Sequence, residues 1–75
     1  MRAYVLINAS PGLALELARR LRQVSAIKDA DAITGQYDVI AICEAVDVNE
    51  LSRLIVGEIQ KVEGVFKTTT CLSIA

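Results

Sequence analysis

A short stretch from Gly35 to Asp38, with the sequence Gly-Gln-Tyr-Asp, carries the side chains of this chain that are best suited to chemistry. Apolar runs that contain β-branched residues flank it. A glycine between two such runs indicates a β-hairpin, because glycine accepts a positive φ without steric cost. A tight turn needs little beyond a glycine and a polar partner. Here a tyrosine and an aspartate, Tyr37 and Asp38, also lie where the chain leaves the turn. Functional groups on a loop held by a rigid scaffold indicate a ligand site, and nothing here indicates a reaction.

The side chains of this stretch suit a small, charged ligand. Asp38 can hold a ligand ammonium group by a charge-assisted hydrogen bond, Gly35 leaves the backbone approachable, and Tyr37 can pack or donate. Thr68 and Thr70 place two hydroxyl groups on one side of a later strand. A structural interpretation stands beside this one, since aspartate often bonds turn amides and threonine is a good strand former. The residues alone leave both interpretations open.

Catalysis is disfavoured by the residue types that the chain lacks. It has no histidine, which removes the usual general base and the commonest metal ligand. The remaining candidates, Asp38, Glu44, Glu63, the serines and two cysteines, have no evident partner base. Asp29 and Asp31 fit a solvated strand edge better than a carboxylate pair. With neither a phosphate loop nor metal-ligand spacing, we expect no catalytic residue, no metal and no cofactor.

Composition limits the class of protein and its partners. Seventy-five residues make one domain, 1–75, and 53% of them are apolar, more than a small monomer readily buries. The surplus favours burial between subunits. The net charge of −1 and the pI of about 5.2 give no basic surface for nucleic acid. Two cysteines are too few for a secreted scaffold, and no apolar run is long enough for a membrane span, so we expect a cytoplasmic protein.

The hydrophobic periodicity predicts six elements. Ser10 and Pro11 suit the first positions of a helix, and Asp47 with Glu50 has the spacing of a capping box. Gly57 falls inside the second helix, where a close helix contact would explain it, and Gly64 marks the end of that helix. We expect strands near residues 2–9, 26–34, 38–44 and 65–74, and helices near residues 11–23 and 48–62.

The order of these elements is typical of an α+β fold, the ferredoxin-like βαββαβ sandwich. Right-handed crossovers place both helices on one face of a four-stranded antiparallel sheet. The first, third and fourth strands are apolar on both sides, so the other face of the sheet should be buried as well. Sheet-to-sheet pairing in a twofold dimer would bury it. Some RNA-binding domains share this order, but three aromatic residues and an acidic chain argue against that reading.

Two strings resemble the effector-binding domain of Lrp/AsnC regulators, also called the RAM module. Residues 33–38, Ile-Thr-Gly-Gln-Tyr-Asp, followed by an apolar strand, resemble that family's TG-x-[YF]-D hairpin. Residues 64–70, Gly-Val-Phe-Lys-Thr-Thr-Thr, resemble the GV-x-x-T-x-T start of its last strand. The resemblance covers essentially all 75 residues, and the two motifs at this separation are more specific than either alone.

The resemblance implies a site, an assembly and a role. Family modules dimerise through their sheets, often form rings of dimers, and bind amino-acid effectors in clefts between dimers. The implied ligand-binding residues here are Gly35, Gln36, Tyr37, Asp38, Thr68 and Thr70, with Gln36 at a variable position.

The chain starts directly at the first strand, so the resemblance implies a stand-alone module without a helix-turn-helix or direct DNA binding. We expect a small-molecule-binding, oligomerising module that regulates transcription or amino-acid metabolism. Its expected partners are a second copy, an amino acid, and full-length Lrp/AsnC-type regulators. The alternatives are a small dimeric ferredoxin-like enzyme and a purely structural assembly partner.

Overall fold

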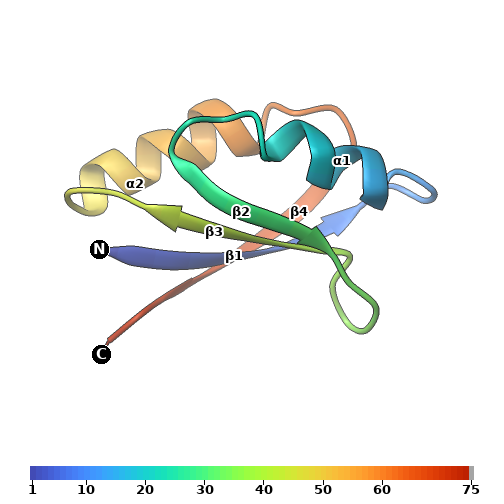
Figure 1. Cartoon of the computed structure of the whole chain (residues 1–75), viewed down its shortest axis with the longest axis horizontal. Coiled ribbons are helices and arrows are strands. Elements are labelled where there is room, and N and C mark those ends of the chain that lie inside the picture. The colour runs from blue at the N-terminus through green and yellow to red at the C-terminus, as the bar shows by residue number, and fades with distance from the viewer. Residues whose placement is uncertain (75) are drawn as a thin grey trace.

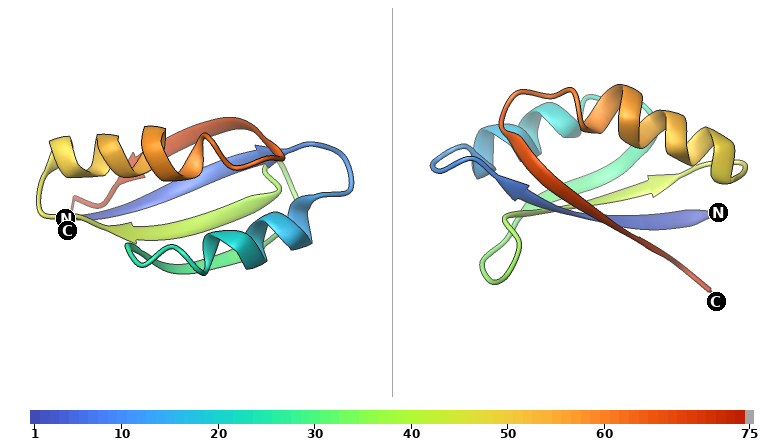
Figure 2. Two further views of the ribbon diagram at one scale, coloured as in Figure 1. Left: turned by 90° about the horizontal axis from the view of Figure 1, so that it is seen from above. Right: turned by 180° about the vertical axis from the view of Figure 1, so that it is seen from behind.

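A four-stranded antiparallel sheet with two helices on one face forms the molecule in the computed structural model, which describes residues 1–74 (Figure 1). The strands lie in the order β2-β3-β1-β4, and the view from above shows the helices side by side over the sheet (Figure 2). The predicted ferredoxin-like βαββαβ order is confirmed. The elements are β1 (Arg2–Ala9), α1 (Ala14–Leu21), β2 (Ile27–Ala32), β3 (Val39–Glu44), α2 (Val48–Leu54), the π-helical turn η1 (Ile55–Ile59) and β4 (Val65–Leu72).

The core lies between the sheet and the two helices. Strand alternation turns every second residue of β1 and β3 toward the helices, and these residues are fully buried. The helices contribute leucines and Ile59 at helical spacing, as expected of amphipathic helices. The largest fully buried side chains are Val5, Ile7, Leu17, Leu21, Val39, Cys43 and Ile59.

The first helix starts later than the sequence predicts. Ser10 does not cap it with its side chain; instead its main-chain oxygen accepts a hydrogen bond from the amide of Leu13 at 3.1 Å. Gly12 has a φ of 80°, a left-handed conformation that a helix cannot pass through. Residues 10–13 therefore form a turn, and α1 begins at Ala14 without a side-chain cap.

The second helix has the predicted start and an unexpected end. The Asp47 carboxylate accepts from the Glu50 amide at 2.8 Å, and the Glu50 carboxylate accepts from the Val46 amide at 3.2 Å. This is the predicted capping box, except that Glu50 accepts from the amide of Val46, the residue before the N-cap, and not from the amide of Asp47 itself. The helix then widens into η1, and a Cβ on Gly57 would meet nothing within 4 Å. The expected close helix contact at Gly57 is therefore wrong.

The open face of the sheet is apolar at its centre and polar along β4. The register aligns Tyr4 with Ile42 and Leu6 with Ile40, and all four side chains point away from the helices and are half-buried. On β4 the same register brings out Lys67, Thr69 and Cys71 instead. The expectation that β4 is apolar on both sides is therefore wrong, because its open side carries Lys67 and Thr69, whereas Leu72 lies on the helix side opposite Ala3.

The two cysteines differ in exposure. Cys43 is fully buried in the core, whereas Cys71 is exposed on the open face. Burial raises the pKa of the Cys43 thiol from 9.0 to about 11, since the charged thiolate is disfavoured away from water.

This pKa predicts a specific loss of stability at alkaline pH. Between pH 9 and 11 the unfolded chain releases the Cys43 proton while the folded chain keeps it, so the free energy of unfolding falls as pH rises. The expected loss approaches about 2–3 kcal/mol. Urea unfolding at several pH values should show this decline in the native chain and in Cys71→Ala, and a smaller decline in Cys43→Ala. Equal declines in all three proteins would contradict it.

Candidate functional site

The hairpin between β2 and β3 is held against the end of β1. The Asp38 carboxylate accepts a hydrogen bond from the Ala9 amide at 2.7 Å, and the Asp38 amide donates to the main-chain oxygen of Ile7 at 2.8 Å. The Asn8 side-chain amide donates to the main-chain oxygen of Gln36 at 3.0 Å. Two side chains, one from β1 and one from the hairpin itself, thus fix the hairpin at Gln36 and at Asp38.

The Asp38 carboxylate therefore holds a main-chain amide, and it still has acceptor sites that a ligand could use. The bond to Ala9 supports the interpretation of Asp38 as a residue that bonds main-chain amides. A carboxylate offers about four acceptor sites on two oxygens, and the Ala9 amide takes one of them. Asp38 is only partly buried, so the structural bond and the predicted ammonium contact are compatible.

The hairpin descends from the sheet on the side away from the helices (Figure 1). Gly35 has a φ of 133° at its tip, a conformation that favours glycine. Gln36 is exposed, and Tyr37 is half-buried. The four predicted hairpin residues, Gly35 to Asp38, are therefore contiguous at one end of the open face.

The predicted threonines lie on the other side of the sheet. Thr68 pairs with Ile7 and Thr70 with Val5, so both point to the helix side. The Thr68 hydroxyl accepts a hydrogen bond from the Gln60 side chain at 3.0 Å. Strand β1 separates β4 from the hairpin. Within one chain, the structure does not bring the threonines and the hairpin into one cleft.

Sequence reasoning did not select Asn8, which holds Gln36. Its signal was weak: a polar residue at the end of an otherwise apolar strand, on the open side by alternation. The partner, Gln36, is 28 positions away in the sequence, so no local pattern linked the two.

Two surface hollows of the described residues lie away from the hairpin. One, of about 30 Å³, has room for about one water and lies between α1 and Glu63. The other is a shallow hollow on the outer side of α2 and η1, lined by Ser52, Arg53, Val56 and Gly57. Neither includes a predicted site residue. In residues 1–74, no group of three or more acidic, cysteine or histidine side chains could hold a metal ion.

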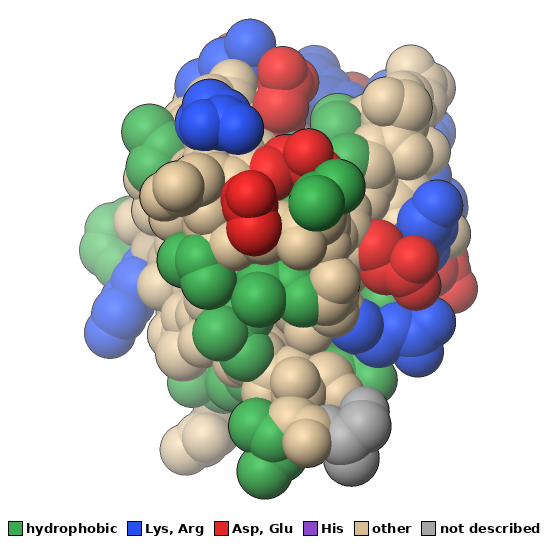
Figure 3. Space-filling model, turned by 90° about the vertical axis from the view of Figure 1, so that its left-hand side faces the viewer, with side chains coloured by type: hydrophobic (Ala, Val, Ile, Leu, Met, Phe, Trp, Pro, Cys, Tyr) green, Lys and Arg blue, Asp and Glu red, His purple; other side chains and the backbone are tan. Residues whose placement is uncertain are grey.

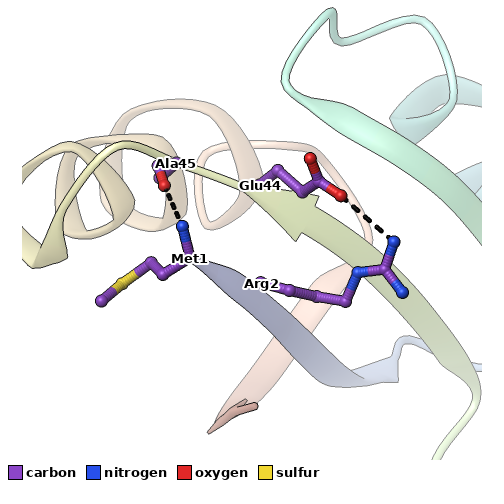
Figure 4. A network of polar contacts seen from close by, with 4 residues as sticks. All are labelled: Met1, Arg2, Glu44 and Ala45. Atoms are coloured by element: carbon purple, nitrogen blue, oxygen red, sulfur yellow. Dashed lines mark hydrogen bonds and ion pairs between the residues drawn. The ribbon is translucent and has the colours of Figure 1, made fainter. Parts of the chain in front are cut away.

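The end of the molecule opposite the hairpin exposes several hydrophobic side chains. Exposed hydrophobic side chains lie at the start of β1, after β3 and at the end of β4, and the space-filling view shows them beside acidic groups (Figure 3). Main-chain bonds join Met1 with Ala45, and Arg2 forms an ion pair with Glu44 at 3.1 Å (Figure 4). The exposed hydrophobic residues of this end are Met1, Val46, Val48, Leu72 and Ile74. None of the described helices is long and apolar enough to cross a membrane.

The whole chain matches a known family of ligand-binding domains. Residues 2–75 match the model of the Lrp/AsnC ligand binding domain, so the chain belongs to that family. It is 23% identical over 74 residues to an uncharacterized HTH-type transcriptional regulator, PF0250 of Pyrococcus furiosus, covering 95% of this chain and 49% of that protein. The chain thus spans about half the length of this relative.

A second relative is an enzyme. Over 56 residues the chain is 39% identical to homocitrate synthase of Sulfurisphaera tokodaii, which is 75% of this chain and 12% of that protein. The matched part is therefore a small fraction of the enzyme.

Solved structures share the whole fold. TTHA0845 from Thermus thermophilus superposes with a TM-score of 0.91 at 28% identity, covering 99% of this chain and 92% of that one. The regulator NMB0573 from Neisseria meningitidis, solved as a complex with L-Met, gives a TM-score of 0.88 at 18% identity, covering 99% and 49%. The second likeness concerns the fold alone.

Proposed function

We propose that this chain binds an amino acid or a similar small metabolite, assembles with copies of itself, and catalyses no reaction. The observation that carries this proposal is the hairpin from Gly35 to Asp38, which is held by two side-chain hydrogen bonds and ends in a partly exposed carboxylate. An α-amino group needs a fixed counter-charge, and Asp38 supplies one at the rim of the sheet. The complex of NMB0573 with L-Met supports this ligand class. We further propose a cytoplasmic protein that forms a single domain.

Assembly follows from the open face of the sheet. Tyr4, Leu6, Ile40 and Ile42 form a continuous apolar surface on the two central strands. Such a surface is typical of an interface, and a second sheet packed face to face would cover it. Because Thr68 and Thr70 lie on the helix side, a cleft that uses them together with a hairpin needs a contribution from another copy. This agrees with a ring of dimers, in which the ligand binds between dimers.

The test is a thermal-shift screen of the common amino acids. A ligand at a hundred times its Kd stabilises the native protein by about 2.7 kcal/mol, or about 10–20 °C for a domain of this size. We expect at least one amino acid to raise the melting temperature in this way. No shift with any of them would reject the ligand and favour a purely structural assembly partner.

The effect of the ligand passes to a partner protein in this proposal. The match to PF0250 favours a full-length regulator of the same family, joined through mixed assembly. The match to homocitrate synthase favours a second candidate, the control of a biosynthetic enzyme. Sedimentation of this chain mixed with each purified partner from its own organism, with and without the ligand found in the screen, separates the two. A complex that forms only with the ligand identifies the partner. If the sedimentation of the chain is unchanged in both mixtures, both candidate partners are rejected.

A further inference from the structure

Three loops at the hairpin end of the molecule are tied together by hydrogen bonds. The first tie joins the Asp38 carboxylate to the Ala9 amide at 2.7 Å. The second joins the Ser10 amide to the main-chain oxygen of Gly64 at 2.8 Å. Ala9 and Ser10 are neighbours, so the two ties lead from the β2–β3 hairpin, through the β1–α1 turn, to the residue just before β4.

The first tie continues the β1–β3 ladder with a side chain. Odd-numbered residues of β1 exchange main-chain hydrogen bonds with β3, as the mutual bonds of Met1 and Ala45 show at the other end. The Ala9 amide therefore points toward β3, but β3 begins only at Val39. The Asp38 carboxylate supplies the missing acceptor, so the position of its oxygen, more than its charge, makes this tie.

The second tie is closely packed. Gly64 has a φ of 103°, and a Cβ placed on it would lie 3.2 Å from the Leu13 side chain. The Leu13 side chain of the β1–α1 turn therefore lies against Gly64, immediately before β4. That strand carries Thr68 three residues further on, where its hydroxyl accepts from Gln60.

We propose that Asp38 is a positioning residue that couples the hairpin to the start of β4 through Ala9, Ser10 and Gly64. The coupling gives the hairpin, and the threonines that the same chain contributes to another proposed cleft, one common support. The role of this coupling rests on the proposed function, because a ligand bound at the hairpin would alter, through these hydrogen bonds, the strand that carries Thr68 and Thr70. The hydrogen-bonded tie itself exists without a ligand and can be measured without one.

The experiment is amide hydrogen exchange, followed by NMR, on the full chain without ligand. Asp38→Asn keeps a side-chain oxygen for Ala9 and removes the charge, so the amides of Ala9 and Ser10 should exchange within about threefold of the native rates. Asp38→Glu keeps the charge and displaces the oxygen, and Asp38→Ala removes both. In these two variants both amides should exchange at least tenfold faster, as expected when a hydrogen bond to a charged group is lost.

Asp31→Ala is the matched control, because Asp31 lies on β2, which β3 separates from β1, and its carboxylate faces Arg22 at 4.0 Å. Its Ala9 and Ser10 amides should keep native rates. If Asp38→Ala does not fold, the comparison of Asp38→Asn with Asp38→Glu still tests the coupling. An unchanged Ser10 amide in Asp38→Glu would overturn the coupling, and fast exchange of the Ala9 amide in Asp38→Asn would overturn the role of geometry.

The proposed ligand role of Asp38 can be tested independently of this coupling. If Asp38 also holds the ammonium group, Asp38→Asn should lower the affinity for the ligand of the thermal-shift screen about tenfold or more while keeping native exchange rates. Native affinity in Asp38→Asn together with weak binding in Asp38→Glu would leave the coupling intact and reject the charge contact.

Discussion

Leu6→Asp is expected to convert the proposed assembly into a particle of 8.1 kDa. Leu6 lies at the centre of the open face, between Ile40 on β3 and Thr69 on β4. In a face-to-face dimer its replacement would bury an unpaired carboxylate in each subunit. Burial without a partner costs several kcal/mol per charge, and each 1.4 kcal/mol weakens association tenfold. Sedimentation velocity at micromolar concentration measures the result, with Ile40→Asp as a second variant at the same surface.

The matched control is Leu15→Asp, which places the same charge on the outer side of α1. Leu15 is 79% exposed, so this variant should sediment as the native protein does. Cys71 gives an independent readout, because it lies on the same face as Leu6. Its thiol should react slowly with an alkylating reagent in the native assembly and quickly in Leu6→Asp. A native protein that sediments at 8.1 kDa, or a Leu6→Asp variant that stays assembled, would reject the interface.

The fold could be predicted because local patterns agree with the global arrangement. Alternation puts Val5 and Ile7 on one side of β1, and the structure buries that side against the helices. The placement of Thr68 and Thr70 in one row on β4 is also confirmed, because alternation depends only on neighbouring residues. The capping box at Asp47 is a local pattern of the same kind.

The errors fall where local patterns compete. Ser10 and Pro11 are good first residues of a helix, but Gly12 follows them and takes a left-handed conformation that the sequence only permits. Gly57 suggested a helix contact because a mid-helix glycine is costly, whereas the helix widens into a π-helical turn there. Periodicity at 3.6 residues per turn cannot signal such a change.

The candidate site was only partly accessible to sequence reasoning. The hairpin and its carboxylate follow from glycine and the flanking strands. The contacts that hold the hairpin, from Asn8 to Gln36 and from Ala9 to Asp38, join residues 28 and 29 positions apart. They depend on the register of β1 against β3, which no single strand specifies. The separation of the threonines from the hairpin depends on the strand order in the same way.

Ile7→Ala is expected to cause the largest loss of stability among single core substitutions at the hairpin end. Ile7 is fully buried on a central strand, between Val39 and Thr68, and its main-chain oxygen accepts from the Asp38 amide. Truncation leaves a cavity in a packed core and costs about 2–5 kcal/mol. For a domain of this size, a loss of about 3 kcal/mol lowers the melting temperature by roughly 12–24 °C.

A graded series separates the cavity from a general loss of apolar surface. Ile7→Val removes one methyl group and should cost about 0.5–1.5 kcal/mol. The control Val56→Ala, at a side chain that is 64% exposed, should stay within about 0.5 kcal/mol of the native chain. Urea unfolding at one fixed protein concentration gives all three values, because the proposed assembly would make the apparent stability depend on concentration. If Ile7→Ala costs no more than Val56→Ala, the core does not close over the end of β1, and the hairpin lacks the rigid support that the proposed site requires.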